Sequence, residues 1–390
     1  GVDESLVDNA VVSLAIEQSV FVEEVEEITA EYLAPFYYAE VGVCKRLMDV
    51  SMVDMTCALT NIDDMIRTFQ REQGIFLAPN QREGVIEAIS NGVTVITGGP
   101  GTGKTTIINC IIKLLEQQGM TVVLAAPTGR AAKRMTETTG CEAKTIHRLL
   151  EYSYAEEGQY FQKNEDDPIL ADAIIIDEMS MVDILLMNHL LKAILPGTRL
   201  ILVGDVDQLP SVGPGNVLRD IISSGVIKVV RLTEIFRQAQ ESMIVLNAHR
   251  INQGQLPYLN ARDGDFFFDK HESPRDILAT LLDLTCRRLP MFADYHPLKD
   301  IQVLAPMRKG AIGVNNLNME LQKALNSPSF GKAEKIFRDT LFREGDKVMQ
   351  IKNNYRTAWK RKADGIVMEE GEGVFNGDMG SIQCIDDEEQ

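Results

Sequence analysis

The sequence lacks the features of a membrane or secreted protein. No run approaches the ~18 apolar residues of a membrane helix, and no basic stretch with an apolar core opens the chain, which begins Gly-Val rather than Met. The six cysteines, at positions 44, 57, 110, 141, 286 and 384, form no Cys-x-x-Cys pair and no zinc-type spacing. Scattered single thiols fit a reducing compartment, so we expect a soluble, cytoplasmic protein with no membrane partner.

Basic residues are absent from both ends of the chain. Residues 1–40 hold ten Asp/Glu and residues 364–390 hold nine, without any Lys or Arg. The two ends together carry a charge of −19. Because the net charge of the whole chain is −18, residues 41–363 have a net charge of +1. Because the local charge of a groove, rather than the total charge, sets phosphate affinity, the acidic composition does not exclude DNA or RNA as a ligand.

The chain length of 390 residues predicts two to three domains, the first at residues 1–76. Apolar spacing predicts helices at 5–18, 38–50 and 60–73 and a β-hairpin at 19–33. This region is either a winged-helix-like docking module or a capping module that packs on the next domain. An acidic hairpin would be repelled by phosphates, which favours the capping module.

Two α/β domains are predicted after residue 76, at 77–237 and 238–390. Apolar β-branched runs between helical patterns are typical of a parallel sheet covered on both faces. In the first domain the predicted strands are Val93–Thr97, Thr121–Ala126, Ala173–Ile176, Arg199–Val203 and Ile227–Leu232. In the second, a weaker series gives strands at Asp265–Phe268, Ile301–Leu304 and Lys347–Ile351, and helices at Pro274–Arg287 and Val314–Leu325.

A phosphate-binding loop lies between the first of these strands and the following helix. The sequence GGPGTGKTT satisfies the pattern G-x-x-x-x-G-K-[ST], whose backbone N–H groups cradle phosphate oxygens at a helix N-terminus. Lys104 is expected to reach the β- and γ-phosphates, and Thr105 to ligate Mg²⁺. The loop residues are Gly98, Gly99, Pro100, Gly101, Thr102, Gly103, Lys104, Thr105 and Thr106.

Other polar residues follow strands of the same predicted sheet. Asp177 and Glu178 end the strand AIII, where an α/β sheet binds its ligands. We expect Asp177 to hold Mg²⁺ and Glu178 to orient or deprotonate the attacking water. Gln208 could donate to a γ-phosphate, Gln81 could read an adenine edge, and Arg237 could reach a γ-phosphate across a cleft. For Gln81 and Arg237, a solvated surface residue is the alternative, and for the Gln208 segment a simple turn.

The motifs stand in the order NQ, GGPGTGKTT, APTGRAAKRM, TIHRLL, IIIDEMSMVD, GDVDQLPSVGPG, LTEIFRQ and LAPMRKG. This order resembles a superfamily 1 helicase, and GDVDQLPSVGPG and LTEIFRQ are similar to the RecD-like (RecD/TraA type) family. The resemblance implies a P-loop NTPase with two RecA-like domains, ATP between them and single-stranded DNA across their top, moving 5′ to 3′. The resemblance also implies, for the nucleotide-site residues named above, the same roles that their chemistry predicts.

The resemblance also implies DNA contacts in three loops. They are the strand-to-helix loop APTGRAA, the segment TIHRLL and the second-domain loop LAPMRKG. A helix N-terminus after Thr128 suits a phosphate, and small alanines permit close approach. The residues concerned are Thr128, Gly129, Arg130, His147, Arg148, Pro306 and Arg308.

Two further segments leave alternatives open. Aromatic flanks around AEEG predict a β-hairpin within Glu151–Pro168, which is either the family's strand-separating pin or an ordinary surface insertion. Residues 347–362 contain six basic residues with Tyr355 and Trp359 and no acid. This composition suits stacking on single strands, and a solvated loop is an equal alternative.

Two late superfamily motifs, an ITVHKSQG-like stretch and a YTAITRA stretch with a γ-phosphate arginine, are not found in this sequence. The segment near 345–390 resembles the entry to the family's small β-barrel insertion. We therefore expect a C-terminally truncated fragment with an incomplete second domain.

The leading hypothesis is an ATP-dependent 5′-to-3′ DNA helicase that uses ATP and Mg²⁺. Its expected partners are single-stranded DNA, duplex junctions and recombination or repair proteins. The alternatives are an RNA-directed helicase of the same superfamily and a non-motor recruitment protein with a nucleotide switch. The acids at Asp177 and Glu178 argue against the switch, since a pure binder needs no general base.

The first prediction concerns turnover by this polypeptide. The phosphate loop is intact, but the late arginine, worth roughly 10³–10⁵ in rate, is missing. The chain should therefore bind ATP, hydrolyse it slowly and fail to unwind a duplex. Steady-state ATPase and strand-displacement assays with single-stranded DNA check this. DNA-stimulated turnover of about 1 s⁻¹ or more would contradict the prediction.

Overall fold

A computed structural model describes residues 3–25, 27–53, 61–155, 158–234, 241–259, 264–352, 354–363, 366–374 and 377–386. The chain forms two compact units, Gly1–Phe266 and Phe267–Gln390. The first unit includes α11 (Met243–Asn252), whose His249 contacts the Pro100 carbonyl, and the predicted domain boundaries stay predictions. No helix in the described part of the chain is long and apolar enough to cross a membrane.

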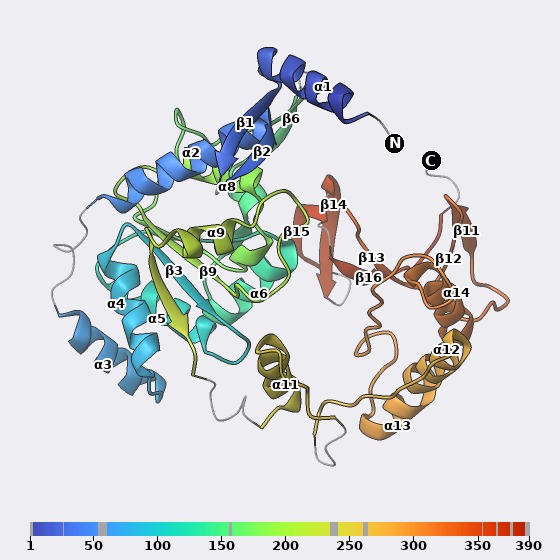
Figure 1. Ribbon diagram of the computed structural model, residues 1–390. Coiled ribbons are helices and arrows are strands. Elements are labelled where there is room, and N and C mark those ends of the chain that lie inside the picture. The colour runs from blue at the N-terminus through green and yellow to red at the C-terminus, as the bar shows by residue number, and fades with distance from the viewer. Residues whose placement is uncertain are drawn as a thin grey trace. The chain divides into compact units, whose positions relative to one another are not determined.

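The first unit is built on a six-stranded parallel sheet, in which Figure 1 labels β3 and β9. The strand order is β10-β3-β9-β8-β4-β5. The five predicted strands are confirmed, and β5 was missed because three residues, one of them lysine, carry too little hydrophobic pattern. The strands are β3 (Val93–Gly98), β4 (Val122–Ala126), β5 (Ala143–Thr145), β8 (Ala173–Ile176), β9 (Arg199–Gly204) and β10 (Lys228–Leu232).

Both faces of this sheet are covered by helices, because alternate strand residues point to opposite faces and both sets are apolar. Ile174 and Ile176 pack in one core, whereas Ala173 and Ile175 pack in the other. The first face carries α2 (Ala34–Ser51), α7 (Ile146–Leu149), the short 3₁₀ helix η2 (Met179–Met181), α8 (Ile184–Lys192) and α9 (Val217–Ser224). The second carries α3 (Ile62–Gln73), α4 (Pro79–Ser90), α5 (Lys104–Gln117) and α6 (Gly129–Thr139).

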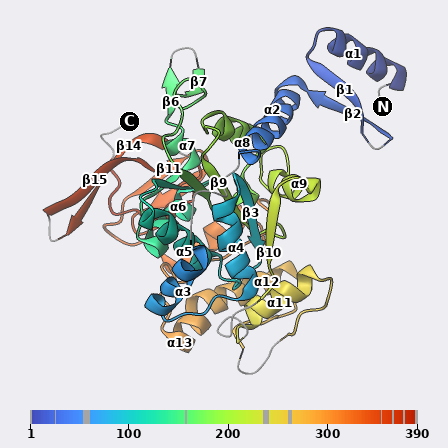
Figure 2. The same cartoon turned by 90° about the vertical axis from the view of Figure 1, so that its left-hand side faces the viewer.

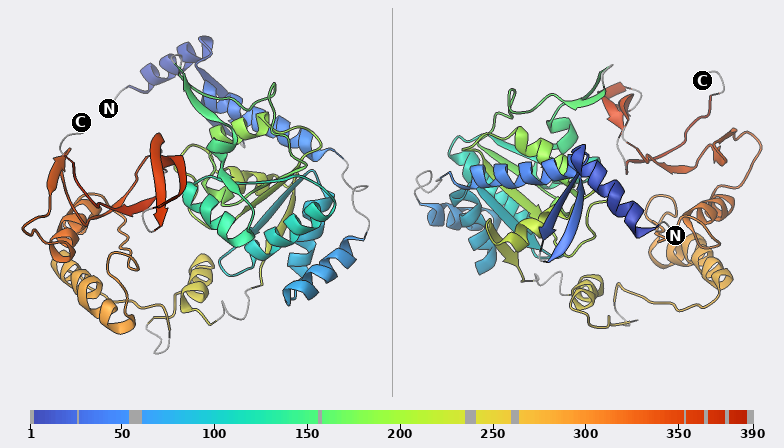
Figure 3. Two further views of the ribbon diagram at one scale, coloured as in Figure 1. Left: turned by 180° about the vertical axis from the view of Figure 1, so that it is seen from behind. Right: turned by 45° about the horizontal axis from the view of Figure 1, so that its top comes forward.

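The N-terminal region has the predicted helix and hairpin. It consists of α1 (Glu4–Ile16) and the antiparallel strands β1 (Val20–Val25) and β2 (Ile28–Leu33). The next helix, α2, lies beside α8 (Figure 3) and buries Val43 and Leu47 in the core of the sheet. Either module could pack in this way, so the capping and docking interpretations both stay predictions.

The insertion after α7 is a β-hairpin, as the sequence predicts. The strands β6 (Tyr152–Ala155) and β7 (Gly158–Phe161) pair antiparallel, from Tyr152 opposite Phe161 to Ala155 opposite Gly158. Figure 2 shows the hairpin standing out from the sheet beyond α7.

The second unit does not contain the predicted parallel sheet within its described residues, and this expectation is corrected. The segments 265–268 and 301–304 belong to no strand. Neither segment pairs with another strand among the described residues, and the Ile301 carbonyl accepts instead from Lys347 Nζ at 3.1 Å. A strand forms only where a neighbouring backbone completes its ladder.

Helices and antiparallel strand pairs make up the rest of this unit. The predicted helices are found, although the first passes into a π-helical turn. The helices are α12 (Pro274–Asp283), η3 (Leu284–Arg288), α13 (Leu289–Ala293) and α14 (Val314–Leu325). The pairs are β11 (Glu334–Phe337) with β12 (Thr340–Arg343), β13 (Lys347–Met349) with β16 (Met379–Ser381), and β14 (Asn354–Ala363) with β15 (Ile366–Val374).

The second prediction concerns the stability of the first unit. Ile175 lies in the central strand β8 and is 0% exposed, so Ile175→Ala should lower the free energy of unfolding by about 2–5 kcal/mol. Leu170→Ala is the control, because Leu170 is 82% exposed, and it should change stability by less than about 0.5 kcal/mol. Urea denaturation measures both. Equal losses for the two variants would contradict the assigned core.

Candidate nucleotide-binding site

The phosphate loop runs from the end of β3 to the start of α5. Gly101 and Gly103 have φ angles of 74° and 83°, a left-handed conformation that side chains rarely adopt. Thr102 is buried, and its Oγ1 donates to the Gly99 carbonyl at 2.8 Å. The two glycines therefore turn the backbone, and Thr102 fixes the turn from within.

Lys104 is held at this loop by the loop's own backbone. Its Nζ donates to the Gly98 carbonyl at 2.5 Å and to the Gly99 carbonyl at 3.1 Å. Phosphate oxygens carry more negative charge than amide carbonyls and are stronger acceptors for an ammonium group. The lysine is thus already placed where a phosphate could take over these hydrogen bonds.

Gln81 supports the loop from α4. The side chain is 2% exposed. Its Oε1 accepts from the Ala78 N–H at 3.0 Å, and its Nε2 donates to the Thr102 carbonyl at 2.9 Å. Gln81 is therefore not the solvated residue of the alternative interpretation. Adenine reading by this amide stays a prediction, and the observed hydrogen bonds tie the start of α4 to the loop.

Asp177 and Glu178 directly follow β8, as expected. The Glu178 N–H donates to Asp177 Oδ1 at 2.8 Å. Glu178 itself has φ 54° and ψ 41°, a left-handed conformation that costs a non-glycine residue about 1–3 kcal/mol. The backbone is therefore bent at the point where the second carboxylate leaves the strand.

The electrostatic surroundings connect these acids to Lys104. Burial raises the pKa of the Asp177 carboxyl, and the Glu178 N–H and the positive charges of Lys104 and Arg134 oppose this shift. Burial also raises the pKa of Glu178, the charges of Asp177 and Asp205 add to the rise, and Lys104 and Arg134 again oppose it. The two acids therefore lie within electrostatic reach of the phosphate-loop lysine.

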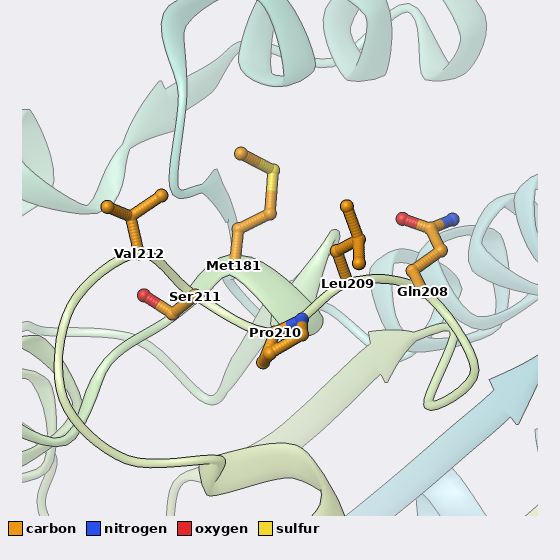
Figure 4. Close-up of a pocket in the computed structure, with 6 residues that line it drawn as sticks. All are labelled: Met181, Gln208, Leu209, Pro210, Ser211 and Val212. Carbon is orange, nitrogen blue, oxygen red and sulfur yellow. The ribbon is translucent and has the colours of Figure 1, made fainter. Parts of the chain in front are cut away.

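The segment after β9 completes this edge of the sheet. Asp205 is 4% exposed and accepts from the Asp207 N–H at 3.1 Å and from Gln208 Nε2 at 3.5 Å. Gln208 lines a shallow pocket with Met181, and their side chains rise to the same side in Figure 4. The other lining residues are Leu209, Pro210, Ser211 and Val212.

The residues fit the predicted Mg²⁺ site. Thr105 lies exposed in the first turn of α5, and Asp177 is a partly buried carboxylate with a raised pKa, which a cation would lower. No group of three or more His, Cys, Asp or Glu side chains that could hold a metal occurs among the described residues. Mg²⁺ keeps several waters and binds through one or two carboxylates plus substrate phosphates.

The residues predicted to contact DNA in the first unit lie on two segments. Thr128 caps α6 by accepting from the Ala131 N–H at 3.2 Å, so Gly129 and Arg130 open the helix. His147 packs against Tyr152 and Phe161 at the base of the hairpin, with ring centroids 5.8 and 5.9 Å away. Burial lowers the pKa of His147. Arg148, by contrast, is exposed.

The other predicted residues lie elsewhere. Pro306 and Arg308 are in an exposed loop of the second unit, before α14. Arg237 lies outside the described residues. In the basic segment, Trp359 is 37% exposed on β14, and Lys360 pairs with Glu370 of β15 at 3.4 Å.

Three residues of this site were not predicted from the sequence. Asp205 stands in the quoted motif GDVDQLPSVGPG, and an acid directly after a buried strand was a usable signal. Arg134 follows Arg130 by one helical turn, a spacing that places both on one face of α6. His249 contacts the phosphate loop across 149 residues of sequence, and no local pattern reveals such a contact.

Family comparisons match two parts of the chain. Residues 81–214 match a model described as an AAA domain. Residues 317–390 match a model described as the SH3 domain of an ATP-dependent RecD-like DNA helicase. The first match contains the phosphate loop, both acids and Gln208, and the second contains the segment predicted to begin a small β-barrel.

Curated relatives extend the similarity across most of the chain. The ATP-dependent RecD2 DNA helicase of Deinococcus radiodurans is 36% identical over 306 residues, which are 78% of this chain and 38% of that protein. The RecBCD enzyme subunit RecD of Mycolicibacterium smegmatis is 32% identical over 277 residues, 63% of this chain and 50% of that protein. The chain thus spans half or less of the length of these relatives.

Solved helicase structures are more distant. A Pif1 helicase from Bacteroides in complex with ADP-AlF3 and ssDNA is 18% identical with a TM-score of 0.39, covering 79% of this chain and 82% of that chain. A Pif1 helicase from Candida albicans is 21% identical with a TM-score of 0.40, covering 80% and 69%.

The third prediction concerns the pH dependence of stability. When burial raises the pKa of a folded carboxyl, the folded state binds more protons than the unfolded state between the two pKa values. Stability therefore falls as pH rises through this window. Asp177→Asn removes the buried charge, so it should raise the urea midpoint at neutral pH. The gain should shrink as the pH is lowered toward about 4, the ordinary pKa of aspartate.

Asp63→Asn is a control of opposite sign. Arg82 donates to Asp63 Oδ1 at 2.5 Å, and this hydrogen bond lowers the pKa of the carboxyl. The stabilisation that the Asp63–Arg82 interaction provides is present above the pKa of aspartate in the unfolded state, and it is lost as pH falls. Asp63→Asn should therefore lower the midpoint at neutral pH. A lower midpoint for Asp177→Asn as well would overturn the assignment of Asp177 as a buried acid whose charge is only partly compensated.

Proposed function

The chain belongs to the RecD-like helicase family, and on this basis we propose that it is the motor part of an ATP-dependent 5′-to-3′ DNA helicase. The observation that carries the proposal is that the phosphate loop, the Gln208 segment and the two acids follow β3, β9 and β8, which are adjacent strands of one parallel sheet. A phosphate-binding cation and two acids within electrostatic reach of one another are what hydrolysis of a nucleoside triphosphate requires.

Each residue has a role in this proposal. Lys104 and the backbone N–H groups of the loop bind the phosphates, while Thr105 and Asp177 would hold Mg²⁺, which neutralises charge on the phosphates when bound. Glu178 orients the attacking water and accepts its proton, because a carboxyl with a raised pKa is a better base at neutral pH. Gln208 contacts the γ-phosphate.

Three further groups complete the proposal. Gln81 reads the adenine, Arg237 contributes a positive charge at the γ-phosphate, and the SH3-like segment belongs to the second domain.

Single-stranded DNA is bound alternately by the loop at Thr128 and the loop at Arg308. Because ATP draws the two domains together and hydrolysis releases them, the alternation converts turnover into steps along one strand. The hairpin β6–β7 separates the strands of the duplex.

Two other functions make different predictions. An RNA-directed helicase of the same superfamily would unwind RNA in preference to DNA, and matched unwinding assays on the full-length protein separate the two. A non-motor nucleotide switch would show no stimulation of its ATPase by any nucleic acid. The two acids beside Lys104 favour the motor, since a switch that only binds nucleotide needs no base.

The fourth prediction is that Lys104→Ala lowers ATPase activity by roughly 10²–10³-fold, as the loss of one oriented charge in such a site does. Single-strand affinity should stay largely intact, because the lysine faces the nucleotide. Lys113→Ala is the control, since Lys113 lies exposed on the same helix, and it should change neither quantity by more than about twofold. Normal turnover of the Lys104 variant in the full-length protein would refute the assignment of the phosphate site.

A further inference from the structure

A histidine from outside the sheet touches the phosphate loop. His249, on α11, has its Nε2 3.2 Å from the Pro100 carbonyl. A carbonyl oxygen only accepts, so Nε2 carries the proton and donates it. His249 lies beyond the segment 81–214 that matches the AAA domain, and none of the roles proposed above uses it.

The loop is shaped to let this ring approach. A Cβ atom built on Gly99 would lie 2.6 Å from His249 Cε1, a separation that real Cβ atoms essentially never show, and 3.3 Å from Nε2. Gly99 is not among the glycines with positive φ, so its backbone suits any residue. A side chain at this position would therefore displace the imidazole of His249.

The hydrogen bond fixes a peptide plane of the loop. In a trans peptide the C=O and the following N–H point in opposite directions. Because the Pro100 carbonyl points to His249, the Gly101 N–H points away from it. Backbone N–H groups of such loops bind phosphate oxygens. The histidine therefore holds the Gly101 N–H in one orientation before any phosphate arrives.

His249 sits on a segment that is held together by contacts between its own residues, which we call the α11 strap (residues 241–259 and 264–266). Asn247, 0% exposed, donates to the Tyr258 carbonyl at 2.8 Å and accepts from the Tyr258 N–H at 2.7 Å. Arg250 donates to the Leu256 carbonyl at 2.9 Å and stacks 4.0 Å from the Tyr258 ring centroid. Asp265 accepts hydrogen bonds at the start of the helix. The strap leads along the chain to residue 267, where the second unit begins.

We propose that His249 is a positioning residue that orients the Gly99–Gly101 turn for phosphate binding and couples nucleotide occupancy to the α11 strap. The proposal rests on the proposed function only in taking the loop to bind a nucleoside triphosphate. The peptide that a phosphate would bind through the Gly101 N–H is the same peptide whose carbonyl His249 holds, so the phosphate and α11 are linked through one peptide unit.

The test uses the 390-residue chain with Mg²⁺ and the fluorescent analogue mant-ATPγS. His249→Ala should weaken binding of the analogue by about three- to tenfold, as the loss of one hydrogen bond does. His249→Gln, which keeps an N–H donor, should restore most of the affinity. Arg250→Ala loosens the strap without touching the loop and should leave the affinity within about twofold of the wild type.

Hydrogen–deuterium exchange separates positioning from general destabilisation. In the wild type the analogue should change exchange in residues 243–252, and in His249→Ala this change should disappear while residues 98–106 still respond. Gly99→Ala should weaken binding in the wild type and have a smaller effect in the His249→Ala background, because the clash is then absent.

Three results would overturn the proposal and leave the proposed function intact. They are an unchanged affinity of His249→Ala, equal effects of Gly99→Ala in both backgrounds, and no nucleotide-dependent exchange at residues 243–252 in a wild type that binds the analogue. No binding of the analogue by the wild type would instead contradict the proposed function.

Discussion

All six strands of the central sheet in the first unit run parallel, and this constraint places the whole candidate site. In a parallel sheet every strand ends at the same edge, so the loops that follow the strands are neighbours there. The strands β3, β9 and β8 are adjacent in the sheet. The phosphate loop follows β3, the Gln208 segment follows β9 and the two acids follow β8. Three segments up to 110 residues apart in sequence are thereby brought to one place by hydrogen bonding between strands.

The chemistry of the site depends on charges that the fold leaves incompletely balanced. Asp177 and Glu178 are partly buried, and the cations within reach, Lys104 and Arg134, only partly offset the cost of burying their charges. Glu178 in addition has a left-handed backbone. Such strain and such unbalanced charge are kept where the surrounding structure holds them firmly. Here the two cores on either face of the sheet supply that support.

The loop conformation rests on contacts from three different parts of the chain. Gln81 binds the Thr102 carbonyl from α4, Thr102 binds the Gly99 carbonyl from within, and His249 binds the Pro100 carbonyl from α11. In each contact a side chain donates a hydrogen bond to a backbone carbonyl of the loop. Because the C=O and N–H groups of a peptide unit point in opposite directions, these contacts also orient the N–H groups that a phosphate would use.

The central sheet could be predicted because its signal is local and repeated. Strands of four or more apolar residues between helical patterns indicate a buried parallel sheet, and only the short edge strand β5 escaped. The positions of Lys104, Asp177 and Gln208 followed from the same pattern. In the second unit the pattern failed at 265–268 and 301–304, because a short apolar run becomes a strand only if another backbone pairs with it.

The sequence itself determined where the strands lie along the chain, which residues flank them and which family the motifs resemble. Each of these depends on residues a few positions apart. Only the tertiary structure decided that Gln81 is buried against Thr102, that Arg134 acts on the two acids, and that His249 reaches Pro100. These contacts join residues 21 to 149 positions apart, and their partners are chosen by the packing of helices on the sheet, which no local spacing records.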